Sequence, residues 1–186
     1  MFDEGFEHLL QVAAKLDLPD GLSAEVFGGA IVVAPWKPAF YAKRMRAVSR
    51  QLEEHLPKGH EIFTAPARFR FPDLEAALGP DCYVYDPELA EPDAVTVPGE
   101  ALALALTLTT EASRPYDLGP KLDVYGRGGV PVHVLADMHD RTLTAYSDPS
   151  PERGYRTRTT VEFGEPLRLP EPFDFELDTA AFAAKL

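Results

Sequence analysis

The stretch "ALALTLTTEASRPYD", Ala103–Asp117, decides the fold that we expect for this chain. It opens as a run of apolar and β-branched residues and then breaks into a small polar turn. An unbroken apolar run is typical of a strand that is buried on both faces, so we expect a central strand over Leu102–Thr109. The middle of that strand carries Thr107, and the first acid, Glu111, comes only after the strand has ended.

Helices and further strands are expected on both sides of this central strand. In chain order they are a helix over about 3–16, a hairpin in "AEVFGGAIVVAP" with Gly28 and Gly29 as its turn, a helix over about Phe40–Leu56, an interrupted strand over Glu61–Phe71, a connector over Pro72–Asp81, a strand over Cys82–Asp86, a short helix over Leu118–Gly126, a strand over Val130–Ala136 with its hairpin partner, a last strand in "TRTTVEFGEPLRLP" and a short helix over Thr179–Lys185. This order predicts an α+β or mixed α/β fold, with a central mixed sheet flanked by helices. The length of 186 residues predicts a single domain over 1–186, with an N-terminal helix within 1–17 and a C-terminal extension over 171–186.

The charge of the chain restricts its partners. With a net charge of −12 the chain repels nucleic acid on average, so DNA binding needs a local basic surface. Lys43, Arg46 and Arg50 share one side of the expected long helix and are the candidate phosphate-contacting residues, with solvated surface as the alternative. No apolar run approaches the roughly 20 residues that cross a bilayer, so no membrane partner is expected. The single cysteine, Cys82, indicates a reducing, cytoplasmic setting.

The sequence lacks the common hydrolase and nucleotide-binding signatures, which leaves carboxylates as the candidate chemistry. Asp81 follows Pro80 at the head of an expected strand, a position that can hold a carboxylate rigidly at the end of a sheet. A Mg²⁺-dependent phosphodiesterase needs such oxygen ligands, and it benefits from a lysine such as Lys121 in the helix after the central strand. The alternative is an aspartate that only caps a turn or a strand.

Four segments, taken in order, carry a resemblance to a known family. They are "LPDGLSAEVFGGAIVVAP", "GPDCYVYDP", "SRPYD" followed by Lys121, Tyr125 and "GRGGVPVHVLAD", and "GEPLRLPEPFDFELD". In this order and at this spacing the chain resembles the Uma-type putative restriction endonuclease family, a branch of the PD-(D/E)xK nuclease superfamily. The resemblance implies a restriction-endonuclease-like fold, a site made of Glu25, Asp81 and Lys121, Mg²⁺ or Mn²⁺ as the cofactor of an active enzyme, and DNA as the partner.

Two positions depart from the pattern of that family. The family has a glutamate on the central strand where this chain has Thr107, and an acid after the first hairpin turn where this chain has Ala30. The resemblance therefore implies a degenerate member with an impaired metal site, which needs no cofactor. One alternative is an active Mg²⁺-dependent endonuclease that uses Asp81 with Glu25 or Glu111, together with Lys121. A second alternative is a non-catalytic regulatory or structural module that acts as a homodimer.

Overall fold

The larger of two main sheets forms the centre of the molecule. The computed structural model describes residues 4–35, 39, 41–91, 94 and 96–184. Six strands of this sheet run in the order β11-β10-β9-β8-β6-β3. Their bounds are β3 Glu61–Phe63, β6 Cys82–Tyr85, β8 Leu102–Leu108, β9 Val132–Asp137, β10 Thr142–Ser150 and β11 Gly154–Glu162. Because β8 pairs in parallel with β9 and antiparallel with β6, the sheet is mixed, as the sequence predicts.

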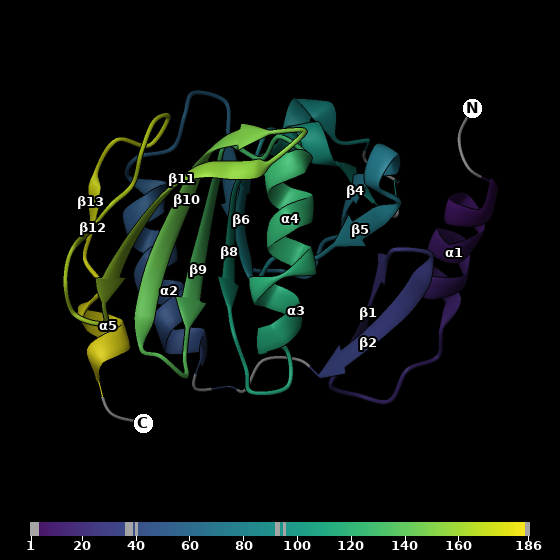
Figure 1. Cartoon of the computed structure of the whole chain (residues 1–186), viewed down its shortest axis with the longest axis horizontal. Helices are drawn as coiled ribbons and strands as arrows, with labels where there is room; N and C mark the ends of the chain where they lie inside the picture. Colours follow the sequence, from purple (N-terminus) through teal and green to yellow (C-terminus); the bar gives the residue numbers. More distant parts are fainter. Residues whose placement is uncertain (1–3, 36–38, 40, 92–93, 95, 185–186) are drawn as a thin grey trace.

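The central strand β8 is buried along its whole length, since both faces of the sheet are covered. On one face Leu104, Leu106 and Leu108 pack with α2 (Tyr41–Glu53) and with the C-terminal segment. On the other face Leu102 and Ala105 pack with α4 (Pro120–Arg127). Figure 1 shows the green helices α3 and α4 in front of the larger sheet and the blue helix α2 behind it.

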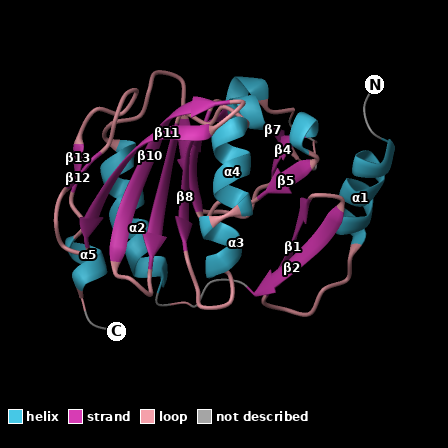
Figure 2. Cartoon of the chain, in the orientation of Figure 1, coloured by secondary structure: helices cyan, strands magenta, loops and turns pink. Residues whose placement is uncertain are grey.

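A second sheet and the N-terminal helix lie beside the larger sheet, on the right in Figure 1. The order of this sheet is β2-β1-β5-β4-β7. Its elements are β1 Leu22–Phe27, β2 Ala30–Pro35, β4 Phe69–Phe71, β5 Ala76–Leu78 and β7 Val97–Pro98, with α1 Glu4–Lys15 packed against β1. The predicted hairpin is confirmed, because Gly28 and Gly29 have φ angles of +55° and +74°, which suit a two-residue turn (Figure 2).

Three predicted elements differ from the structure, and prolines account for two of the differences. The segment Glu61–Phe71 forms two strands in different sheets, because Pro66 has no N–H to continue a ladder. The helix expected over Leu118–Gly126 corresponds to α4, which begins only at Pro120 because a proline disfavours helical geometry at the residue before it, and an unpredicted short helix, α3 (Arg114–Leu118), precedes it. The expected connector Pro72–Asp81 contains β5, which is fully buried.

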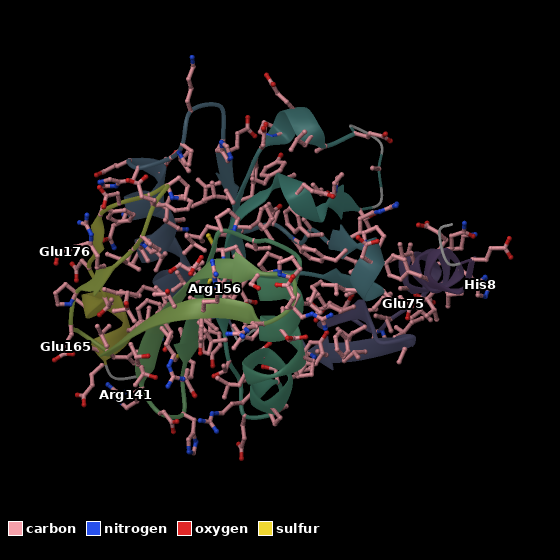
Figure 3. The ribbon with its side chains drawn as sticks, turned by 45° about the horizontal axis from the view of Figure 1, so that its top comes forward. His8, Glu75, Arg141, Arg156, Glu165 and Glu176 are labelled. Carbon is pink, nitrogen blue, oxygen red and sulfur yellow. The ribbon has the colours of Figure 1, made fainter. Side chains whose placement is uncertain are left out.

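The C-terminal segment packs beside α2 and against β10 and β11 of the larger sheet. It contains β12 (Leu167–Arg168), β13 (Glu176–Leu177) and α5 (Ala180–Ala183). Its aromatic side chains enter the core, while Glu165 and Glu176 point outward in Figure 3. Among the described residues, no helix is long and apolar enough to cross a membrane.

Candidate functional site

A pocket of about 630 Å³ lies where the two sheets and three helices meet. Its walls come from β1, the end of β2, α2, the segment 64–68, the turn 79–81, α3 and α4. Glu25, Asp81 and Lys121, which the sequence analysis selects as site residues, all line this pocket. They come from positions that are far apart in the sequence, so the tertiary fold brings them together.

Glu25 and Lys121 form an ion pair that also holds the turn before Asp81. The Lys121 ammonium lies 2.8 Å from Glu25 Oε1 and donates a second hydrogen bond to the carbonyl oxygen of Gly79 at 2.7 Å. The amide of Gly79 donates to the same Glu25 oxygen at 2.6 Å. The pair is well covered, with the side chain of Lys121 7% exposed and that of Glu25 13% exposed. Both residues therefore position the backbone that carries Asp81.

Asp81 is held against the central strand by hydrogen bonds to Leu106 and Leu108, the two neighbours of Thr107. Its amide donates to the carbonyl oxygen of Leu106 at 2.9 Å, and its Oδ2 accepts from the amide of Leu108 at 2.7 Å. Thr107 is fully buried, and its hydroxyl oxygen lies 3.2 Å from Nε2 of His133 on β9. Thr107 is thus next to Asp81 along the ladder, although it does not line the pocket.

A carboxylate that the sequence analysis did not select, Asp117 on α3, also lines the pocket. It is only 2% exposed, and its Oδ2 accepts a hydrogen bond of 2.6 Å from the hydroxyl of Ser113. Ser113 and Asp117 are four residues apart, a spacing that places both side chains on the same side of a helix. That spacing in "SRPYD" is the signal that would have indicated this residue.

The electrostatic field around Lys121 is dominated by carboxylates. Burial by itself lowers the pKa of the Lys121 ammonium, but the charges of Glu25, Asp117 and Asp81 raise it above its usual value. Lys121 is therefore charged at neutral pH. Burial, with the nearby Lys121 charge, lowers the pKa of His133 to about 3, so the imidazole behind Thr107 is neutral.

The basic side of α2 reaches the mouth of this pocket. Lys43, Arg46 and Arg50 are all exposed, and Arg46 lines the pocket. By contrast Arg156, which projects from β11 in Figure 3, is paired with Asp148. Glu111 is exposed in the turn after β8 and does not line the pocket.

The carboxylates of Glu25 and Asp81 are partly engaged by other groups of the chain. Mg²⁺ is held by oxygen ligands in near-octahedral geometry, with one or two carboxylates commonly joined by waters and substrate oxygens. Within the part of the chain that the structure describes, no three Asp, Glu, His or Cys side chains are grouped so that they could hold a metal ion. Oxygens of Glu25 and Asp81 already accept hydrogen bonds from Lys121, Gly79 and Leu108.

Comparisons with known proteins agree with this architecture. The crystal structure of a putative nuclease belonging to DUF820 from Anabaena variabilis ATCC 29413 superposes with a TM-score of 0.67 at 13% identity, over 93% of this chain and 96% of that chain. At that identity the likeness shows the fold, and it confirms the predicted nuclease-like arrangement. No curated protein matches the sequence of this chain. The family model described as "Putative restriction endonuclease" matches residues 6–180, so the chain belongs to that family, Uma2.

Proposed function

We propose that this chain is a nuclease-fold protein that binds DNA and whose cutting site is impaired. The observation that carries the proposal is the environment of Thr107. Its hydroxyl is buried beside His133, on the strand that holds Asp81 through Leu106 and Leu108. A neutral, buried hydroxyl stands where the resemblance to the family implies a glutamate.

The chemical cost of this replacement is large. A hard divalent cation is held by anionic oxygens, and it makes hydroxide from bound water only when it is itself firmly held. A threonine hydroxyl offers no negative charge. The loss of one of two anionic ligands therefore weakens metal binding and removes several kcal/mol of transition-state stabilisation.

The DNA-binding half of the proposal rests on the family and on α2. The family suggests DNA as the partner. Lys43, Arg46 and Arg50 recur at intervals of three and four residues, so their side chains lie along one side of the helix. Arg46 connects that side of the helix to the pocket that contains Asp81 and Lys121.

Thr107→Glu tests whether the scaffold of a metal site is preserved. The new carboxylate would be buried next to Asp81, so we expect the variant to be less stable than the wild type in chelator. Adding Mn²⁺ or Mg²⁺ should raise its melting temperature, because a ligand that binds only the folded state stabilises that state. Thr107→Gln is the matched control, since it has nearly the same shape without the charge, and its melting temperature should not respond to either metal.

The result that would overturn the proposal is a folded Thr107→Glu variant whose melting temperature ignores divalent metal. If the larger side chain prevents folding, Thr107→Asp with Thr107→Asn as its control repeats the test in a smaller volume. Plasmid nicking by Thr107→Glu, but not by the wild type, would add direct support.

A second candidate function is an active Mg²⁺-dependent endonuclease, which is favoured by Glu25, Asp81 and Lys121 lining one pocket. Calorimetric titration of the wild type with Mg²⁺ and Mn²⁺ separates the two. Tight, stoichiometric binding supports the active enzyme, and millimolar binding or none supports the impaired site. A protein that binds no DNA at low salt and sediments as a homodimer would instead support a regulatory or structural module.

A further inference from the structure

We propose that Arg68 and Arg46 form a phosphate clamp across the mouth of the pocket, so that a DNA strand passes from α2 to the segment 64–68. Both arginines line the pocket, Arg46 from α2 and Arg68 from the segment before β4. This inference rests on the proposed DNA binding. It adds a contact residue outside α2 and a path for the strand over the pocket.

The guanidinium of Arg68 is held in place by the core of the second sheet. Its Nε donates a hydrogen bond of 2.7 Å to the carbonyl oxygen of Ala24. Ala24 is 1% exposed and lies on β1, immediately before Glu25. A guanidinium that is already oriented loses less side-chain entropy when it binds a phosphate, and its planar fork suits phosphate oxygens.

Neither arginine of the clamp has a carboxylate partner within the described ranges of the chain. Five other arginines do pair with carboxylates, namely Arg70 with Glu7, Arg114 with Asp137, Arg127 with Asp123, Arg156 with Asp148 and Arg168 with Asp174. Arg46 and Arg68 share the lack of such a partner with a few other described arginines, but these two lie at one pocket. With 30 acidic residues in the chain, carboxylates are abundant. Two arginines without such partners at one pocket leave their positive charge available to an anionic ligand.

The distribution of charge within the pocket keeps a phosphate at its mouth. The lining carries the carboxylates of Glu25, Asp81 and Asp117 and the single ammonium of Lys121, so this part of the pocket repels an anion. The positive charges of Arg46 and Arg68 offset this repulsion of an anionic ligand. At about 630 Å³ the pocket is within the size range that holds small-molecule groups. A phosphodiester bound by Arg46 and Arg68 would be attracted by the two arginines and kept away from the carboxylates.

The test measures the binding of a fluorescent DNA duplex by anisotropy at several salt concentrations. Arg68→Met keeps the aliphatic stem and removes the charge, and we expect roughly tenfold weaker binding at low salt because a charge-assisted hydrogen bond is lost. The slope of log K against log salt should fall by about 0.9, the value for one phosphate contact. Arg70→Met is the matched control, since Arg70 is two residues further on and pairs with Glu7. We expect its binding to equal that of the wild type.

Arg68→Lys is a second variant for the same binding measurement, and it replaces Arg68→Met if that variant does not fold. It keeps the charge but loses the hydrogen bond to Ala24 and the planar fork, so affinity should drop while the salt slope stays the same. Wild-type affinity in either Arg68 variant, or equal weakening by Arg70→Met, would overturn the clamp. If the wild type binds DNA and Lys43→Met or Arg50→Met weakens it while Arg68→Met does not, only the clamp is wrong. If the wild type binds no DNA, the proposed DNA binding is wrong as well.

Discussion

Individual side chains of the pocket hold the fold together, and the Glu25–Lys121 ion pair is the clearest example. Both side chains are largely buried, and both bond to Gly79. Removing one partner of a buried ion pair commonly costs about 3–5 kcal/mol, because the other charge is left without compensation. Near Lys121 the remaining carboxylates Asp81 and Asp117 would add repulsion.

We therefore expect Lys121→Met to lower the free energy of unfolding by about 3 kcal/mol in urea titrations. The Glu25→Gln/Lys121→Met double variant should lose less than the sum of the two single losses, with a coupling of about 1–2 kcal/mol. Lys43→Met, at an exposed position on α2, is the control and should change stability little. Strictly additive losses would show that the two residues act independently.

His133 makes the stability of the protein depend on pH. The usual pKa of histidine is about 6.5, and burial lowers the pKa of His133 to about 3 in the folded protein. Between these values the unfolded chain binds a proton that the folded protein does not, so stability is complete above about pH 6.5 and falls as the pH decreases. From pH 7.5 to pH 5.0 we expect the wild type to lose about 2 kcal/mol more than His133→Gln, as measured by urea unfolding. An equal loss in both proteins would contradict this assignment.

At the scale of whole elements, the C-terminal segment belongs to the core. Within the C-terminal extension expected over 171–186, Phe173, Phe175 and Phe182 pack against the larger sheet and α2. Phe182 is fully buried, and its ring lies 5.2 Å from that of Phe163. The segment is short and rich in proline and acid, so its pattern alone does not reveal which of its residues are covered.

Phe182→Ala should therefore destabilise the protein by about 3–5 kcal/mol, the usual cost of removing a buried phenylalanine side chain. Phe63→Ala is the matched control, because Phe63 is 43% exposed. It should cost much less in the same thermal unfolding experiment. Similar losses for the two variants would mean that the C-terminal segment contributes little to the core.

At the scale of the whole molecule, the net charge of −12 opposes binding to DNA, so binding must be local and sensitive to salt. Replacing Lys43, Arg46 and Arg50 together by glutamine should weaken DNA binding and lower the salt slope by roughly 0.9 for each phosphate contact removed. The triple replacement of Arg153, Arg156 and Arg158 by glutamine removes the same charge from β11 and its turn. If this control weakens binding equally, the net charge and not α2 controls the interaction.

The sequence alone determined those features that depend on local periodicity and turn chemistry. The apolar stripe of α2 was predictable because Tyr41, Met45, Val48 and Leu52 recur near the helical period, and all four are buried. The glycine turn of the hairpin and the buried strand β8 were predictable for similar reasons. The resemblance to the family indicates Glu25, Asp81 and Lys121 from the sequence alone, and these three residues line one pocket.

Only the tertiary structure decided what those residues contact. Periodicity has a range of a few residues, whereas Glu25 and Lys121 are 96 residues apart and meet because two sheets pack on α4. The same long-range packing divides Glu61–Phe71 between two sheets, buries Asp117 in the pocket and places His133 against Thr107. It also brings Arg68 and Arg46 to the lining of one pocket, and it places the Arg68 guanidinium against the carbonyl oxygen of Ala24 on β1.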